Sequence, residues 1–240
     1  MDLQSTIEQL VVANRILALK GVLDSFGHIS ARHPEKPERY LMSRARSARV
    51  VEKEDILEYA LDSKVVDSRG FRLFGERPIH GCIYRARPDV MAICHNHAYG
   101  LLPFAVTKRV MRPAIHMASA IGDEVHTWDI RDEFGETNLL VTTNEMGDSL
   151  AQFLGNRNAA LMRGHGSVVA GKSIPEMVFI AYYLQINAEV LIHSEKLGEV
   201  QYLSREEVKL STQLNLSPLA QERVWEDWVT QAGFPSPSSK

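Results

Sequence analysis

The sequence has few cysteines and none of the features of a membrane or nucleic-acid-binding protein. It contains 2 cysteines in 240 residues, Cys82 and Cys94, without CxxC spacing, which excludes a disulfide scaffold and a cysteine-based zinc module. No apolar run approaches the ~20 residues of a membrane-spanning helix. The net charge of −3 and the lack of a basic block argue against a nucleic-acid partner. Because the first residues do not resemble a signal peptide, we expect a cytoplasmic protein with reduced, buried thiols.

The chain is long enough for one large domain with a full core, and its hydrophobic content of 45% is that of a globular protein. Apolar periodicity, prolines and glycines predict strands that alternate with helices, which indicates an α/β protein. We expect one domain over residues 1–233 and a disordered Pro-Ser tail over 234–240. The expected helices cover 3–18, 78–86, 145–154 and 175–197, followed by a polar helical remainder. Residues 26–32 are expected to be a loop that enters a strand, and the other expected strands cover 39–43, 65–66, 90–94, 138–142 and 159–162.

Three histidines follow two of these predicted strands. His95 and His97 come directly after the apolar run 90–94, and His165, between two glycines, follows the run 159–162. Two strand ends that bring three imidazoles to one edge of a sheet form a divalent metal site with an open coordination position. The His-x-His pair alone is also typical of one packing and one exposed histidine, but the glycine-flanked third histidine favours a metal-dependent enzyme. Zn, Mn, Fe and Co all suit such ligands.

Glu76 precedes the helix that is predicted to begin at Pro78. A carboxylate in this position caps a helix N-terminus, where the helix dipole favours negative charge. Beside a metal, it binds the ion or takes up and returns protons. The spacing alone does not choose between these roles.

An ordered set of motifs, from about residue 3 to 197, resembles the class II aldolase/adducin family. The motifs are Glu76-x3-His80, Arg87-Pro88-Asp89-Val90, His95-Asn96-His97, Gly164-His165-Gly166-x4-Gly171 and the helix start Pro175-Glu176. The resemblance implies a three-layer α/β/α domain around a central mixed β-sheet. It also implies a cyclic homotetramer with active sites at subunit boundaries.

The same resemblance implies roles for individual residues. His95, His97 and His165 match the positions that bind one divalent metal ion per subunit. Glu76 matches the glutamate that binds the resting metal or acts as acid and base. His80 matches a family position that orients its neighbours.

Several positions depart from the pattern of the sugar-phosphate aldolases in this family. An asparagine of the first loop is His28 here, and the serine pair before the glutamate is Phe74-Gly75. A catalytic tyrosine is replaced by Met117, which lies next to His116. The phosphate-binding Thr/Ser-Gly loop is replaced by Ser43-Arg44-Ala45-Arg46-Ser47, and Arg163 stands where an asparagine is common. These changes remove a phosphate cradle and argue against a phosphorylated sugar as substrate.

Arginines take the place of that cradle, and guanidinium groups bind carboxylates through paired hydrogen bonds. We therefore expect a small carboxylated substrate that is bound by Ser30, Ser43, Arg44, Arg46 and Arg163. Alternatively, the arginines of the 43–47 loop are solvated or pair with Glu52 and Glu54. The run from Gly27 to Arg32 resembles the branch of the family that decarboxylates hydroxylated aromatic dicarboxylates.

The resulting hypothesis is a metal-dependent decarboxylase of a hydroxylated aromatic or heteroaromatic dicarboxylate. Loss of CO₂ next to a ring hydroxyl leaves a carbanion that a divalent metal stabilises as an enolate-like species. Glu76, His28 and His116 are the candidate proton donors; His28 could instead bind a substrate carboxylate or bridge its own loop. The alternatives are an aldolase for a non-phosphorylated hydroxy-keto acid and a catalytically silent scaffold.

Overall fold

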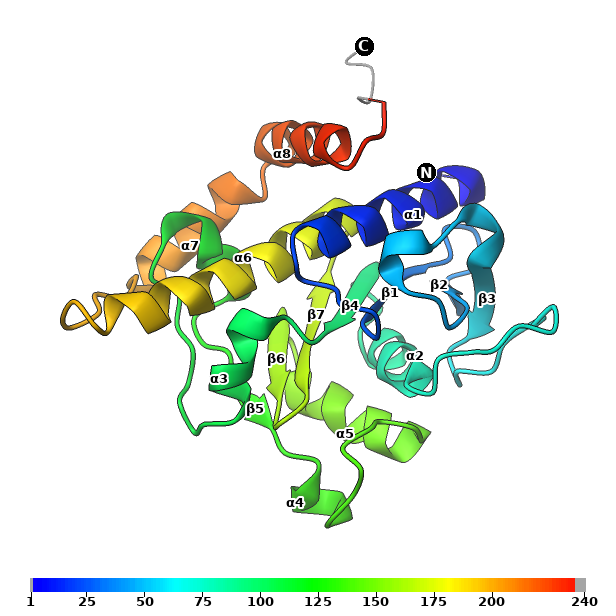
Figure 1. The fold of residues 1–240 in the computed structure, drawn as a ribbon, viewed down its shortest axis with the longest axis horizontal. Coiled ribbons are helices and arrows are strands. Elements are labelled where there is room, and N and C mark those ends of the chain that lie inside the picture. The colour runs from blue at the N-terminus through cyan, green and yellow to red at the C-terminus, as the bar shows by residue number, and fades with distance from the viewer. Residues whose placement is uncertain (1, 236–240) are drawn as a thin grey trace.

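The structure is a computed structural model that describes residues 2–235 of the chain. Within this part, a seven-stranded sheet is flanked by helices (Figure 1). The strands are β1 (His28–Arg32), β2 (Arg39–Ser43), β3 (Ile56–Ala60), β4 (Ala92–Asn96), β5 (Thr127–Trp128), β6 (Ala159–Met162) and β7 (Gly166–Gly171). The α-helices are α1 (Leu3–Leu19), α2 (Arg77–Ala86), α3 (Leu102–Ala105), α4 (Arg131–Phe134), α5 (Asn144–Leu154), α6 (Ile174–Ser194), α7 (Arg205–Asn215) and α8 (Pro218–Gln231). Short 3₁₀ helices are η1 (Ala48–Val50), η2 (Lys53–Asp55), η3 (Tyr99–Leu101) and η4 (His116–Ile121).

The strand order of the sheet is β3-β2-β1-β4-β7-β6-β5. Neighbouring strands are antiparallel except β5 and β6, which are parallel, so the sheet is mixed as predicted. His28 lies opposite His95, and Asn96 lies opposite Ser167. This register brings the start of β1, the end of β4 and the start of β7 to the same edge of the sheet.

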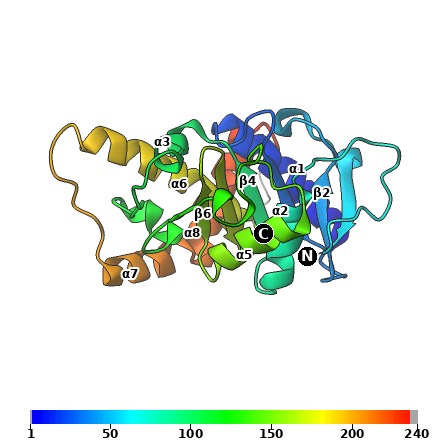
Figure 2. The ribbon, with the colours of Figure 1, turned by 90° about the horizontal axis from the view of Figure 1, so that it is seen from below.

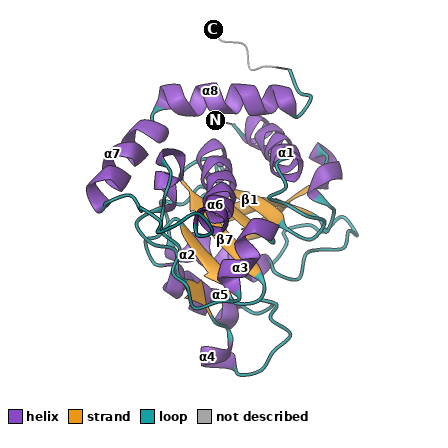
Figure 3. Cartoon of the chain, turned by 60° about the vertical axis from the view of Figure 1, so that its left-hand side comes forward, coloured by secondary structure: helices purple, strands orange, loops and turns teal. Residues whose placement is uncertain are grey.

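The two faces of the sheet pack against different helices, which confirms the three-layer α/β/α fold. Helices α1 and α6 contact each other and cover one face, where Ile29 and Cys94 are buried (Figure 3). Helices α2 and α5 pack side by side on the other face, where Ile93 and Val168 are buried (Figure 2). The strands are apolar on both faces because helices cover both, as expected for a sheet inside an α/β domain.

Local signals explain where the main helices begin. Pro78 lies in the first turn of α2, and Pro175 lies in the first turn of α6, where the missing N–H of proline costs no hydrogen bond. The hydroxyl of Ser173 accepts a hydrogen bond from the Glu176 N–H and caps α6. Both helices were predicted, although α6 ends at Ser194 rather than near residue 197.

Two of the predicted strands are not formed, and some observed strands were not predicted. The strand near 65–66 is instead β3 at 56–60, and Val65 forms only an isolated bridge to Tyr59. Residues 138–142 are irregular, because Leu139 has φ 69° and its N–H bonds the Thr137 hydroxyl instead of a strand partner. The chain after Met162 turns back and forms β7, which the sequence analysis missed.

The C-terminal end of the described chain packs against the domain. Phe234 lies against the core that contains α1, α6 and α8, and its N–H donates to the Val229 carbonyl. The rest of the predicted tail, residues 236–240, lies outside the described residues. Within residues 2–235, no helix combines the length and apolarity needed to cross a lipid bilayer.

Candidate metal centre

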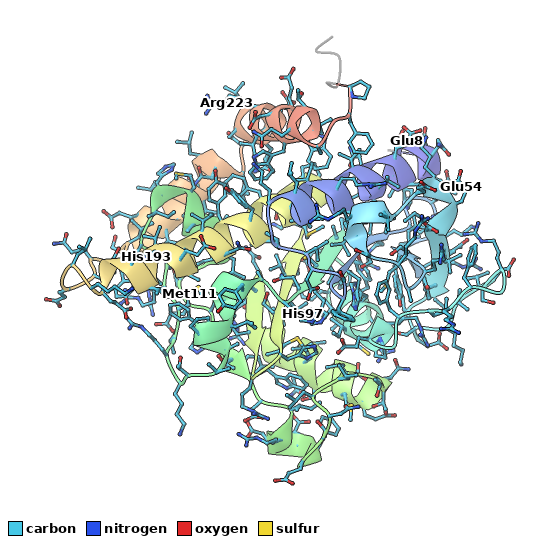
Figure 4. The ribbon with its side chains drawn as sticks, in the orientation of Figure 1. Glu8, Glu54, His97, Met111, His193 and Arg223 are labelled. Atoms are coloured by element: carbon cyan, nitrogen blue, oxygen red, sulfur yellow. The ribbon has the colours of Figure 1, made fainter. Side chains whose placement is uncertain are left out.

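His95, His97, His165 and Glu76 converge at the sheet edge formed by β1, β4 and β7. His95 is the fourth residue of β4, His97 follows that strand, and His165 lies in the turn before β7. Glu76 occupies the N-cap position of α2. One ligand atom from each of the four residues lies within 4.8 Å of the others. The structure therefore brings together the four residues that the sequence predicted as metal ligands (Figure 4, His97 labelled).

The hydrogen bonds of His95 and His97 leave one nitrogen of each ring without a proton. His95 Nδ1 donates to the Ser167 carbonyl at 3.1 Å, and His97 Nδ1 donates to the Asp24 carboxylate at 3.2 Å. An imidazole binds a metal in its neutral form, which has a single N–H, so in that form Nε2 of both rings carries a lone pair. These two atoms are 3.1 Å apart. Two lone pairs repel at this distance, whereas tetrahedral coordination of a zinc-sized ion sets ligand nitrogens about 3.3 Å apart.

Glu76 turns its carboxylate toward the histidines rather than toward its own helix. Its Oε1 accepts a hydrogen bond from the Val141 N–H at 2.9 Å, and its side chain makes no cap bond to α2. Its Oε2 is 3.5 Å from His95 Nε2 and 3.6 Å from His165 Nε2. The irregular 138–142 segment thus supplies a backbone donor to the site.

Glycine on each side of His165 lets β7 approach β4 closely. Gly164 has φ 63°, which favours glycine. A Cβ on Gly166 would lie 2.2 Å from the Asn96 carbonyl oxygen, so only glycine fits there. His165 Nδ1 is buried without a hydrogen-bond partner in the described protein. The four-residue cluster therefore fits a divalent metal ion: its donors converge, two of its rings are aligned by partners outside the cluster, and the ion would balance facing lone pairs.

His28 lies beside the cluster and begins a chain of buried polar side chains. Its ring is 5.1 Å from the His95 ring and 4.5 Å from the Phe74 ring. His28 Nδ1 is 2.8 Å from His80 Nε2, and His80 Nδ1 is 2.6 Å from the Ser30 hydroxyl. The Ser30 hydroxyl is 2.9 Å from the Tyr84 hydroxyl. Burial lowers the pKa of His80 to about 3 and that of His28 well below its ordinary value.

The two serines that we expect to bind the substrate, Ser30 and Ser43, are both buried. Ser30 is fully buried, and its hydroxyl contacts His80 and Tyr84 rather than open space. Ser43 is also buried, at the end of β2, with its backbone paired to Ile56.

The two arginines of the 43–47 loop bind a buried aspartate. Arg44 Nε is 2.6 Å from Asp55 Oδ1, and Arg46 NH1 is 2.6 Å from Asp55 Oδ2. The expected alternative partners were Glu52 and Glu54; Glu52 lies 3.6 Å from Arg46 NH1. The β1–β2 register, in which Ser30 faces Met42, carries Arg44 to the edge of the sheet where His28 lies.

Arg163 and His116 lie apart from this edge of the site. Arg163 Nε is 2.7 Å from Asp129 Oδ1, and its side chain lines a cavity of about 930 Å³ together with Gly164. His116 is exposed at the start of η4, and its carbonyl accepts a hydrogen bond from Asn215 of α7. The contacts of the described chain do not join His116 to the four clustered residues.

Two residues that support this site were not predicted from the sequence. Tyr84 carried a signal, because Glu76, His80 and Tyr84 follow each other at four-residue spacing and share one face of α2. Asp24 carried only a weak signal, as the residue whose carboxylate accepts from the Phe26 and Gly27 N–H groups in a turn. Its contact with His97 joins residues 73 positions apart and could not be read from local pattern.

Comparison with known proteins identifies the family. The model of the class II aldolase and adducin N-terminal domain matches residues 8–192, so the chain belongs to this family. The chain is 30% identical to the decarboxylase tropJ of Talaromyces stipitatus over 240 residues, 90% of each chain. It is 26% identical to the 3,4-dihydroxyphthalate decarboxylase of Arthrobacter keyseri over 181 residues, 72% of each chain.

A solved structure shares the fold. The L-fuculose 1-phosphate aldolase of Glaciozyma antarctica superposes with a TM-score of 0.77 at 20% identity, over 95% of this chain and 88% of that one. Decarboxylases and aldolases both break carbon–carbon bonds, so the relatives of this chain are lyases. The structural likeness, at this identity, extends to the fold alone.

Proposed function

We propose that this protein is a metal-dependent decarboxylase of a hydroxylated aromatic or heteroaromatic dicarboxylate. The main observation that supports this proposal is the four-residue cluster with the His28–Phe74 ring pair beside it. His28 contacts both the Phe74 ring, at 4.5 Å, and the His95 ring, at 5.1 Å. A flat apolar ring beside convergent metal ligands suits an aromatic acid better than a sugar phosphate. The names of two relatives, both decarboxylases, support the same reaction.

His95, His97, His165 and Glu76 would hold one divalent ion, with Zn, Mn, Fe and Co as candidates. When bound, the ion would stabilise the negative charge that develops as CO₂ leaves. Asp24 and the Ser167 carbonyl orient His97 and His95 through their Nδ1 protons.

Glu76 is the best placed of the three candidate proton donors. In the reaction the bond from the ring carbon to the carboxylate breaks, its electron pair stays on the ring carbon, and that carbon then takes a proton. Oε1 of Glu76 is fixed by the Val141 N–H, whereas Oε2 faces the histidines and has no backbone donor. When the carboxylate does not bind the ion, Oε2 is therefore the oxygen that can take up a proton and deliver it to the ring carbon.

Arg44, Arg46 and Arg163 are the proposed partners of the substrate carboxylates. Arg44 and Arg46 each use one nitrogen on Asp55, which leaves N–H groups of both guanidinium forks for a substrate. Arg163 borders the 930 Å³ cavity next to the His165 turn. His116 would reach a reacting substrate from a neighbouring subunit, in the homotetramer that the family resemblance implies.

The test is an assay of metal-reconstituted protein with ortho-hydroxy aromatic diacids, beginning with 3,4-dihydroxyphthalate, and with hydroxy-keto acids. CO₂ is followed by mass spectrometry beside pyruvate and aldehyde. We expect CO₂ from a diacid, and we expect His95→Ala to abolish it. The matched control is His193→Ala, because His193 is exposed near the far end of α6 (Figure 4). Pyruvate or aldehyde without CO₂ would instead make the protein an aldolase, and a chain that binds no metal would be a silent scaffold.

A further inference from the structure

Four buried side chains from β1 and α2 form one hydrogen-bonded chain that ends at the metal centre. His28, Ser30, His80 and Tyr84 are 2%, 0%, 0% and 1% exposed. The successive contacts are 2.8, 2.6 and 2.9 Å long. None of the four belongs to the metal-binding cluster, and no carboxylate takes part in this hydrogen-bonded chain. The direction of these hydrogen bonds decides whether His28 presents an N–H group or a lone pair to the metal centre.

The position of each hydrogen in this hydrogen-bonded chain follows when the contacts are taken in order from Tyr84, the end opposite to His28. The Ser30 hydroxyl is the one hydrogen-bond partner of the Tyr84 hydroxyl within residues 2–235. A buried phenol must donate its single hydrogen, so Tyr84 donates to Ser30. Ser30 then has its own hydrogen left for its second partner, Nδ1 of His80.

The same count continues through the two rings. His80 Nδ1 accepts from Ser30, so the single proton of neutral His80 lies on Nε2 and is donated to His28 Nδ1. His28 Nδ1 is thereby an acceptor and holds a lone pair, so the ring carries its proton on Nε2. This nitrogen has no partner among the described residues, and the ring that carries it lies against His95 and Phe74. The chain therefore ends in a donor at the metal centre.

We propose that His28 is a fixed hydrogen-bond donor, through Nε2–H, to an anionic oxygen of the substrate. His80 is the positioning residue that holds His28 in this tautomer, and Ser30 with Tyr84 holds His80. This inference rests on the proposed function, because it names the group that binds a carboxylate or phenolate oxygen of the aromatic acid. It also separates His28 from the proton donor that the reaction needs.

His28 cannot readily deliver the proton to the ring carbon. Loss of the Nε2 proton would leave an imidazolate unless His80 passed a proton to His28 Nδ1. That transfer would draw on Ser30 and finally leave a phenolate at Tyr84, whose pKa burial raises far above its ordinary value. The delivery of the proton therefore falls to Glu76, and His28 contributes to substrate binding.

The first test needs no substrate. We would label the histidine rings with ¹⁵N, load the protein with diamagnetic zinc and identify the His28 and His80 signals with His28→Asn and His80→Asn. We expect a pyrrole-type Nε2 and a pyridine-type Nδ1 in both residues. A proton on Nδ1 of His28 would overturn the proposal. Because this measurement is independent of turnover, a missing decarboxylase activity and a wrong tautomer are separate results.

A pair of tyrosine variants tests the origin of the tautomer. Tyr84→Phe removes the hydrogen that sets the direction of the chain, so a population of the opposite His28 tautomer should appear. Tyr40→Phe is the matched control: Tyr40 is fully buried and stacks on His80, but its hydroxyl donates to the Arg77 carbonyl outside the chain. An unchanged His28 tautomer in Tyr84→Phe would contradict the proton count.

A binding measurement tests the role of the donor. Phthalate, a plain aromatic diacid, would be titrated calorimetrically into the zinc-loaded protein. His28→Leu should raise the Kd roughly 10- to 100-fold, while His28→Asn, which retains an N–H donor, should restore most of the affinity. Both variants should keep one zinc per chain. Equal phthalate affinity in wild type and His28→Leu would exclude His28 as the donor.

Discussion

Two groups of histidines lie side by side in this protein and differ in how their hydrogen bonds are satisfied. In the chain of His28, Ser30, His80 and Tyr84, each group donates to the next, and only the outer Nε2 of His28 is left over. In the cluster around His95, lone pairs and a carboxylate face one another at 3.1 to 3.6 Å without a proton between the rings. Convergent acceptors without donors indicate an ion site, whereas matched donors and acceptors indicate a hydrogen-bond network that orients its side chains.

Loss of one cluster imidazole should have the largest effect. His95→Ala removes a ring that is central to the cluster, so we expect bound metal to fall to near zero and activity to fall by roughly a thousandfold. Metal content per chain, measured by mass spectrometry after dialysis, checks the first expectation. His193→Ala should retain both metal and activity, and full metal content in His95→Ala would contradict the ligand assignment.

A smaller effect is expected when the support of the cluster is removed and its ligands stay. Asp24→Asn weakens the hold on His97 Nδ1, so the Kd for the metal should rise about 10- to 100-fold. Competition with a coloured chelator measures it. The control is Asp62→Asn, since Asp62 pairs with Lys64 elsewhere. An unchanged Kd would show that His97 needs no outside partner.

A substitution in the hydrogen-bonded chain of His28, Ser30, His80 and Tyr84 should change the stability of the protein rather than its metal affinity. Ser30→Ala leaves the His80 Nδ1 and the Tyr84 hydroxyl buried without their partner, which should lower the free energy of unfolding by about 1–3 kcal/mol. Ser43→Ala, at a buried serine with no side-chain hydrogen bond among the described contacts, should change it by less than about 0.5 kcal/mol. Urea unfolding at neutral pH compares the two variants. Equal losses of unfolding free energy would mean that the hydrogen-bonded chain adds nothing to stability.

A further difference between the two groups concerns pH. Burial lowers the pKa of His80 to about 3 in the folded protein, below the ordinary value of 6.5. The unfolded chain therefore binds more protons in this interval, and His80 makes stability fall as pH drops from about 6.5 to 3. His80→Asn should flatten this part of the stability curve, whereas His193→Asn, at an exposed histidine, should leave its slope unchanged. An unaltered slope in His80→Asn would show that His80 is not neutral when folded.

The sequence predicted the fold and the meeting of the clustered residues because both depend on strong local signals. Apolar runs followed by histidines marked the ends of β4 and β6, and Pro78 and Pro175 marked the helix starts. The tight turn at Gly164 hid β7, because the hairpin partner begins only four residues after β6 ends. The 138–142 run was apolar enough for a strand, but side-chain oxygens capture its N–H groups.

Long-range pairings were beyond the reach of local pattern. The Arg44 and Arg46 guanidinium groups meet on Asp55 because β2 and β3 pair, and this contact depends on strand β3, which was not predicted. The link from Ser30 to Tyr84 joins residues 54 positions apart, from a strand and from the helix that covers it. Helical spacing alone would have placed Tyr84 on the face of Glu76 and His80, without naming its partner.

The four clustered donors come from segments that are far apart in the sequence: the start of α2, the end of β4 and the turn before β7. No unfolded or partly folded chain holds them together, since they meet only after the central strands have paired. An ion that needs all four donors therefore binds the native state alone. Once the concentration of the ion exceeds the Kd, the free energy of unfolding rises in proportion to the logarithm of that concentration. Metal supply would thus govern how long the folded protein lasts, apart from any reaction it performs.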